Sequence, residues 1–262
     1  MTILEKMKTD WDRRAQTTPR YWVDVYHWRT DDEFAQAGRD VAAAIMQFLP
    51  PAPACADWRV LDLGCGVGRV MREIASQFQS VAGVDVSSEM LRHGRPWLAA
   101  AGNVSTHEGA GADLSMFPDA TFDCAYSSLV VQHLPKPVFV SYAAEVNRVL
   151  KPSGRFLFQA LLGHSLDAAP GDTIALQVYH PQEMLEHLTD AGFHYLRDHC
   201  ESQDPRGFGS WWTLFQKVAP ARPAAAPCSD WACEPDAEMS PVDILMYQIL
   251  LAQQLLREEA AP

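Results

Sequence analysis

The stretch "VLDLGCGVGR", residues 60–69, runs from apolar residues into Asp62 and then places glycine at every second position. The apolar residues that follow, among them Val70 and Ile74, are spaced as on one face of a helix, so the segment predicts strand, glycine turn and helix. In open α/β sheets, ligands bind where a parallel strand ends, and glycine lets backbone approach a ligand closely. The stretch therefore predicts a ligand site; the alternative is a tight turn that binds nothing.

The rest of the chain supports a parallel sheet. Buried-strand patterns alternate with helical stretches, which is typical of α/β domains. These strands are predicted at residues 58–63, 80–85, 122–127 and 155–160. We predict a helical, aromatic-rich cap over residues 1–57, the α/β domain over 58–218, and a Pro/Ala-rich linker with a C-terminal helix over 219–262.

Composition excludes several classes of protein. The 262 residues carry a formal net charge of -12, which argues against a nucleic-acid partner. The chain contains no apolar run of membrane-spanning length, and its first residues lack a signal-peptide pattern, so we expect no membrane association and a cytoplasmic location. Six scattered cysteines favour reduced thiols.

Two cofactors compete for the glycine turn. A turn that binds a dinucleotide has the pattern G-x-G-x-x-G, with an acidic residue about 20 positions later. Asp85 meets the second condition. The glycine spacing here is G-x-G-x-G instead. A dehydrogenase therefore remains a disfavoured alternative.

Four motifs in order carry a resemblance to a known family. They are "VLDLGCGVGR", "VAGVDVSSEML", "GAGADLSMFPDATFDCAYSSLVVQHLP" and "EVNRVLKPSGRFLFQ". Together they resemble class I S-adenosylmethionine-dependent methyltransferases over residues 58–218. The resemblance implies a Rossmann-like, seven-stranded, mostly parallel sheet with helices on both faces, and S-adenosyl-L-methionine as cofactor.

The same resemblance implies roles for residues near the first two strands. Gly64 and Gly66 would let the loop pass under the methionine part of the cofactor, with Asp62 near its amino group. Asp85 would accept hydrogen bonds from both ribose hydroxyls, since a carboxylate has two acceptor oxygens. The alternative for Asp85 is a charge that favours the start of the next helix, for which Ser87 or Ser88 is the expected N-cap.

Further residues follow from the later motifs. Asp113 matches the position that receives the adenine amino group, although it could instead cap a short turn. The remaining implied cofactor contacts are Val86, Met90, Ala112, Leu114 and Ser127.

The acceptor side is less defined by the sequence. His133, just after a strand, is the candidate general base for a protonated acceptor. Aromatic residues near the N-terminus predict a lid, with Tyr21 as the expected cofactor or substrate contact. Trp211 and Trp212 lie on a predicted strand, so they point to opposite faces and at most one can line a pocket.

No metal site is predicted. Cys228 and Cys233 are spaced too widely for a usual zinc pair, and His194 and His199, five apart on a predicted strand, are expected on opposite faces.

Methyl transfer to a small-molecule acceptor is the leading functional hypothesis. The alternatives are a methyltransferase acting on protein or RNA, and a non-catalytic S-adenosylmethionine-binding protein. The apolar residues of segment 240–259 cover more than one helix face, so this helix either packs on its own domain or, as we predict, forms a homodimer.

Overall fold

The computed structural model describes residues 1–51, 53–163, 173–204 and 208–218. The predicted linker and C-terminal helix lie outside these residues, so the predicted homodimer stays a prediction. Within the described residues, the helices are α1 Ile3–Thr17, α2 Pro19–Val23, α3 Asp31–Met46, α4 Arg69–Ile74, α5 Ser88–Leu98, α6 Lys136–Val149 and α7 Pro181–Asp190, with short 3-10 turns η1 Ala75–Gln77 and η2 Val131–His133. No helix in this part is long and apolar enough to cross a membrane.

The sheet has the predicted α/β architecture. Its strands are β1 Arg59–Leu63, β2 Ser80–Asp85, β3 Val104–Glu108, β4 Phe122–Ser127, β5 Leu150–Gly163, β6 Val178–Tyr179, β7 Phe193–Asp204 and β8 Phe208–Lys217. They lie in the order β3-β2-β1-β4-β5-β8-β7, with β6 beside β5. Strand β8 runs antiparallel to β5 and β7, whereas the other pairs are parallel. The carboxyl ends of β1, β2, β4 and β5 therefore meet at one edge.

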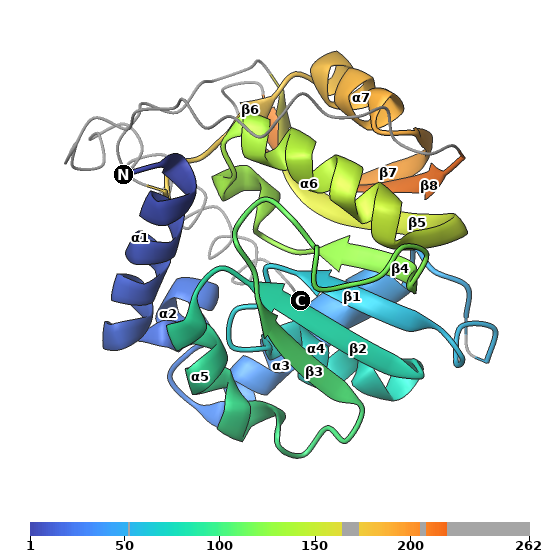
Figure 1. Cartoon of the computed structure of the whole chain (residues 1–262). Helices are drawn as coiled ribbons and strands as arrows, with labels where there is room; N and C mark the ends of the chain where they lie inside the picture. The colour runs from blue at the N-terminus through green and yellow to red at the C-terminus, as the bar shows by residue number, and fades with distance from the viewer. Residues whose placement is uncertain (52, 164–172, 205–207, 219–262) are drawn as a thin grey trace.

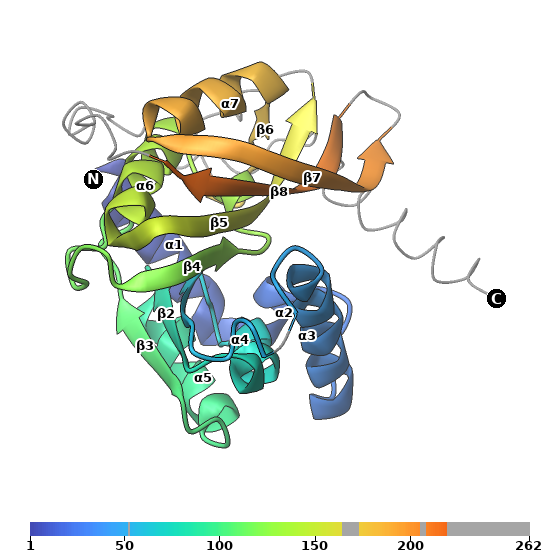
Figure 2. The same ribbon diagram turned by 90° about the vertical axis from the view of Figure 1, so that its right-hand side faces the viewer.

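Helices cover both faces of the sheet, as predicted. Apolar residues of α6 and α7 pack in one core cluster with the strands, and those of α3, α4 and α5 pack in a second cluster on the other face. Figure 2 shows α3 and α4 on the side of the sheet away from α6. The burial of apolar side chains in these two clusters is the main favourable contribution to the stability of the fold.

Helices α1 and α2 stand at the carboxyl ends of the central strands (Figure 1). Helix α1 begins with a capping box between Thr2 and Glu5. Its Asp12 accepts hydrogen bonds from Ser87 Oγ at 2.7 Å and from Glu89 N at 3.2 Å, just beyond β2. Ser87 is also the N-cap of α5, as predicted, because its Oγ accepts from Met90 N. The cap is thus tied directly to the strand end that the sequence marks as a ligand site.

Candidate active site

The glycine loop has the backbone conformation that its sequence requires. Gly64 and Gly66 have φ of +80° and +53°, a region that L side chains rarely adopt. A Cβ on Gly64 would lie 2.4 Å from Val130 Cγ2. The amide of Gly64 donates to Val84 O at 2.8 Å, which ties the loop to the end of β2.

Asp85 links the ends of the first two strands. Its Oδ2 accepts from Gly66 N at 2.8 Å and its Oδ1 accepts from Ser87 N at 2.9 Å. Burial raises the pKa of this carboxyl, and the two backbone hydrogen bonds oppose that rise. Asp85 therefore holds the glycine loop and the start of α5 around one carboxylate.

Asp62 is a second buried carboxyl at the same edge. It is 4% exposed, and its Oδ2 accepts from the Tyr126 hydroxyl at 2.9 Å. Burial raises the pKa of Asp62 to about 7, although the Tyr126 hydrogen bond lowers it. A cation placed beside Asp62 would favour the ionised form.

A cavity of about 530 Å³ opens at this edge of the sheet. Its volume lies in the range of pockets that bind small molecules. One wall is the glycine loop with Asp85, and the cap segment 22–27 and helix α3 form another. A third wall comes from β5, β7 and β8.

The cavity collects seven of the residues predicted from the sequence. They are Asp62, Gly64, Gly66, Asp85, Val86, Met90 and His133. The other predicted residues, Tyr21, Ala112, Asp113, Leu114 and Ser127, are not part of its lining.

Tyr21 packs within the cap instead. Its ring contacts the edges of Trp22 and Trp28, with ring centroids 5.1 and 5.8 Å apart. Trp22 and Tyr26 of the same segment line the cavity. The aromatic lid stays a prediction; the structure places Trp22 and Tyr26, and not Tyr21, against the cavity.

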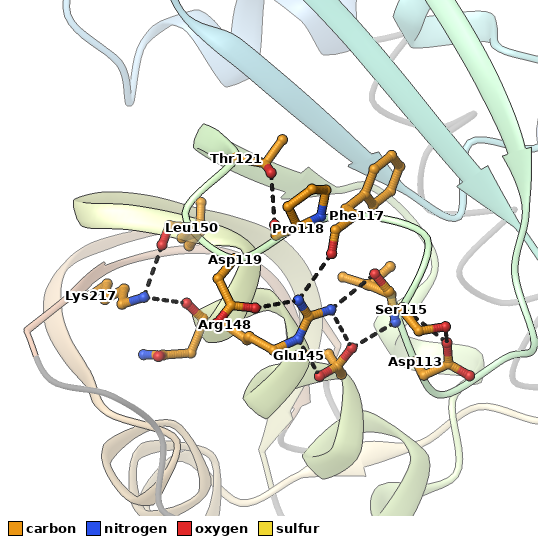
Figure 3. Close-up of polar contacts among 12 residues, drawn as sticks. Asp113, Ser115, Phe117, Pro118, Asp119, Thr121, Glu145, Arg148, Leu150 and Lys217 are labelled. Carbon is orange, nitrogen blue, oxygen red and sulfur yellow. Dashed lines mark hydrogen bonds and ion pairs between the residues drawn. The ribbon is translucent and has the colours of Figure 1, made fainter.

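Asp113 caps its own turn in the structure, and its role toward the adenine stays a prediction. Its Oδ1 accepts from Ser115 N at 3.1 Å and from Ser115 Oγ at 2.7 Å (Figure 3). The loop is further fixed to α6, since Glu145 accepts from Leu114 N and Arg148 donates to Leu114 O and to Glu145. Ala112 and Leu114 are buried in the core beside this loop.

Ser127 is used inside the sheet rather than in the cavity. It is fully buried, and its Oγ donates to Leu63 O at 2.8 Å. The next three residues, Ser128, Leu129 and Val130, line the cavity. The segment after β4 thus reaches the cavity through these three residues, and a cofactor contact of Ser127 stays a prediction.

His133 lines the cavity from η2. Its Nδ1 lies 2.9 Å from the carbonyl oxygen of Ile174. A carbonyl oxygen accepts hydrogen bonds, so Nδ1 carries the proton, and Nε2 of the neutral ring is an acceptor that lies 3.4 Å from Gln132 Nε2. Its ring also meets the edge of Trp11 in α1, with centroids 6.0 Å apart. The imidazole is thus held in one orientation with its basic nitrogen fixed.

Several lining residues were missed at the sequence level. Arg69, directly after the glycine turn, is 4% exposed and its Nη1 lies 3.2 Å from Asp24 Oδ2 of the cap. Burial lowers the pKa of the Arg69 guanidinium, whereas the charges of Asp24, Asp62 and Asp40 raise it. Arginine after a glycine turn was a signal that the sequence offered, but the pairing with the cap requires the fold.

Four lining side chains carry a buried polar atom with no hydrogen-bond partner among the described residues. They are Trp22 Nε1, Arg69 Nε, Ser128 Oγ and Trp212 Nε1. Buried polar groups are normally paired, so such atoms indicate a ligand or water as partner. The lining contains Trp212 and not Trp211, which confirms that at most one of these adjacent side chains lines the pocket.

Comparison with known proteins identifies the domain. A family model described as a methyltransferase domain matches residues 60–154. A malonyl-[acyl-carrier protein] O-methyltransferase of Herminiimonas arsenicoxydans is 31% identical over 183 residues, which are 66% of this chain and 64% of that protein. A 24-methylenesterol C-methyltransferase 2 of Oryza sativa subsp. japonica is 41% identical over 152 residues, 52% of this chain and 40% of that protein. The chain thus spans less than two thirds of the length of either relative.

Solved structures show the same fold. A SAM-dependent methyltransferase from Methanosarcina mazei is similar with a TM-score of 0.54 at 23% identity, over 67% of this chain and 97% of that chain. The [4+2]-cyclase SpnF is similar with a TM-score of 0.58 at 19% identity, over 70% of this chain and 82% of that chain.

Residues 60–154 match the methyltransferase family model, and the fold is that of S-adenosylmethionine-dependent methyltransferases. The cavity of this methyltransferase domain fits the family's cofactor. S-adenosylmethionine presents an ammonium, a carboxylate and two ribose hydroxyls. The cavity offers carboxylates at Asp62 and Asp85 for the first and last of these, and unpartnered donors at Trp22 and Arg69 for groups that accept hydrogen bonds.

In the described residues of the methyltransferase domain, no group of three His, Cys, Asp or Glu could hold a metal ion. The expected opposite orientation of His194 and His199 is wrong. Their partners on β8 are Gln216 and Trp212, which are four positions apart and share a face. A register shift between Tyr195 and Arg197 changes the alternation. Cys228 and Cys233 lie outside the described residues.

Proposed function

We propose that this protein catalyses methyl transfer from S-adenosylmethionine to a small-molecule acceptor. The observation that supports the proposal is the extent of the cavity. It runs from the glycine loop and Asp85 to Trp212 on β8, under the cap segment 22–27. This extent suits two ligands side by side, and the covering cap suits a small acceptor better than RNA or a folded protein.

The cofactor end would be held by groups at the ends of β1 and β2. Asp62 would pair with the ammonium group, and Asp85 would accept from the ribose hydroxyls. Val86 and Met90, which line the same wall, would contact the adenine. When bound, the cofactor supplies a methyl group on a sulfonium, which is a good leaving group.

The protein's own contribution would be mainly orientation. Aligning two reactants in a site can supply on the order of 7–11 kcal/mol of a barrier. The cap would exclude water, because α1 is fixed to the end of β2 through Asp12 and to residue Thr173 through Arg14. His133, with its Nε2 lone pair, would take the proton of a protonated acceptor.

The relatives support a small methylated unit, either free or, as in malonyl-[acyl-carrier protein], carried on a protein. By their names, they include sterol C-methyltransferases and malonyl-[acyl-carrier protein] O-methyltransferases. These names differ in the methylated atom, so the atom methylated by this protein is not assigned. A cytoplasmic location stays a prediction from the sequence.

The test is calorimetric titration of S-adenosylmethionine and S-adenosylhomocysteine into the protein and into Asp85→Ala. We expect binding to weaken on the order of 100-fold in the variant, because it loses hydrogen bonds to a charged group. Asp85→Asn keeps one acceptor oxygen and should lose less. Formation of S-adenosylhomocysteine with candidate acceptors then measures turnover.

Each outcome separates the alternatives. Tight binding with acceptor-dependent turnover supports the enzyme, and tight binding without turnover across a broad acceptor panel favours a non-catalytic binding protein. If neither compound binds the unaltered protein, the proposal is overturned.

A further inference from the structure

The end of the cavity away from the glycine loop is built on one face of the sheet. Gln159 of β5 lies opposite Trp212 of β8, and Leu161 lies opposite Ser210. Residues two apart on a strand share a face, so these four side chains project to the same side. Residues Val41 and Ala44 of α3 line the same cavity. We call Gln159, Leu161, Ser210 and Trp212 the β5/β8 wall.

The polar groups of this wall, except one, are already paired. Gln159 Nε2 donates to Ser210 Oγ at 3.0 Å and also to the Glu201 carboxylate. Gln159 Oε1 accepts from Leu129 N at 3.2 Å, which connects the wall to the segment before η2. Ser210 Oγ lies 3.3 Å from Glu201 Oε2. Gln159 is therefore held in a fixed orientation by three separate segments.

Trp212 is the exception. It is 2% exposed, and its Nε1 has no acceptor among the residues that the structure describes. An indole N–H can only donate, and a buried donor without an acceptor is costly. Phe48 of the segment after α3 packs on the indole, with ring centroids 6.5 Å apart. The ring is thus fixed with an unpaired donor in a wall of the cavity.

The charges along the cavity lining disfavour an anionic hydrogen-bond partner for Trp212 Nε1. An anion would be disfavoured, because carboxylates outnumber guanidinium groups along the described lining. The apolar side chains of the wall and of α3 favour an apolar body next to the oxygen. The charged groups are Asp24, Asp40, Asp62, Asp85 and Glu201, against Arg69.

We propose that Trp212 donates a hydrogen bond to a neutral carbonyl or similar oxygen of the methyl acceptor, and that it selects acceptors with such an oxygen on an apolar body. This inference rests on the proposed function, since it places the acceptor beside the cofactor in one cavity. Trp212 acts here as a specificity-determining residue, and Gln159 positions the wall around it.

The experiment uses small aromatic probes on the full chain saturated with S-adenosylhomocysteine. Acetophenone carries a ketone, ethylbenzene has the same shape without oxygen, and benzoate and benzylamine carry opposite charges. With the tryptophans labelled with ¹⁵N, we expect acetophenone to move the Trp212 indole N–H signal downfield and ethylbenzene to leave it in place. Acetophenone should also bind more tightly than benzoate, and benzylamine, whose ammonium cannot accept a hydrogen bond, should leave the Trp212 signal in place.

Two variants test the residue. In Trp212→Phe, the affinity for acetophenone should fall about three- to tenfold, as expected for one lost hydrogen bond, while the affinity for S-adenosylhomocysteine stays unchanged. Trp97→Phe is the matched control. Trp97 Nε1 is also buried without a partner among the described residues, but Trp97 is not part of this cavity's lining.

The outcomes distinguish the two proposals. If S-adenosylhomocysteine does not bind, the proposed function fails and this inference fails with it. If it binds, the inference is overturned when acetophenone leaves the Trp212 signal unmoved, binds no better than ethylbenzene, or binds less tightly than benzoate. Should Trp212→Phe not fold, the indole shift in the unaltered protein, assigned through its contact with Phe48, still decides the question.

Discussion

The two ends of the cavity are built in different ways. The cofactor end is formed by the stretch from Asp62 to Met90, largely by backbone groups and by two carboxylates at strand ends. The acceptor end is formed by side chains of the cap, α3, β5, β7 and β8, which are far apart in the sequence. A local motif can specify the first end, whereas the second exists only after the sheet has formed.

This difference predicts how each end responds to substitution. Changes at the cofactor end should alter backbone geometry and therefore both stability and cofactor affinity. Changes at the β5/β8 wall should alter acceptor recognition and leave the cofactor bound. A residue that affects both equally would show that the two ends are one site.

The largest effect is expected at Gly64. In Gly64→Ala, the new Cβ would lie 2.4 Å from Val130 Cγ2 at a φ of +80°. Left-handed strain of roughly 1–2 kcal/mol and overpacking of about 1–3 kcal/mol should together lower the free energy of unfolding by roughly 2–5 kcal/mol. Urea denaturation measures this loss, and calorimetry should show weaker S-adenosylhomocysteine binding.

Gly102→Ala is the control for Gly64→Ala, because a Cβ on Gly102 would meet nothing within 4 Å. It should change stability by about 0.5 kcal/mol or less. Adding Val130→Ala to Gly64→Ala should relieve the overpacking but not the backbone strain. Equal urea midpoints for Gly64→Ala and Gly102→Ala would contradict the account of the loop.

A smaller effect is expected from the protonation of Asp62. Its pKa of about 7 means that it binds a proton as the pH falls from 8 to 6. If its ionised form pairs with the cofactor's ammonium, the affinity for S-adenosylmethionine should fall by up to about tenfold per pH unit below pH 7. Calorimetry at about pH 6.0, 6.5, 7.0 and 7.5, a range that brackets this pKa, measures the slope.

Asp62→Asn tests that assignment, because the amide keeps an oxygen for the Tyr126 hydroxyl and cannot titrate. The variant should bind more weakly at pH 7.5 and lose most of the slope. In the folded chain, Asp62 holds a proton that the unfolded chain releases above its ordinary pKa of 3.8. The free energy of unfolding should therefore decrease as the pH rises from about 4 to about 7, and it should decrease less in Asp62→Asn. An unchanged affinity slope in the variant rules out this role.

The sequence predicted what local patterns determine. The bounds of β2 and β4 agree with the predicted strands, and the predicted cofactor-loop residues line the cavity. Tyr21 could not be separated from Trp22 and Tyr26, because the direction of each ring depends on how the cap packs. Trp212 could be placed on a strand face, but its partners on β5 and α3 depend on tertiary contacts. The register shift in β7, which changed the face of His199, also had no sequence signal that we used.

The smallest effect is expected at Asp113, which the family resemblance assigns to the adenine. Its carboxylate is engaged with Ser115, and the loop remains anchored through Glu145 and Arg148. Asp113→Ala should therefore change the affinity for S-adenosylhomocysteine less than about twofold, while losing roughly 0.5–1.5 kcal/mol of stability with the turn.

Asp119→Ala is the matched comparison for Asp113→Ala, since Asp119 contacts Arg148 in the same loop and is not part of the described cavity lining. The two variants should bind S-adenosylhomocysteine alike. A loss of tenfold or more confined to Asp113→Ala would mean that the cofactor draws this loop into the site on binding. The cofactor end would then share the property that distinguishes the acceptor end, because it too would depend on a segment far from the glycine loop in sequence.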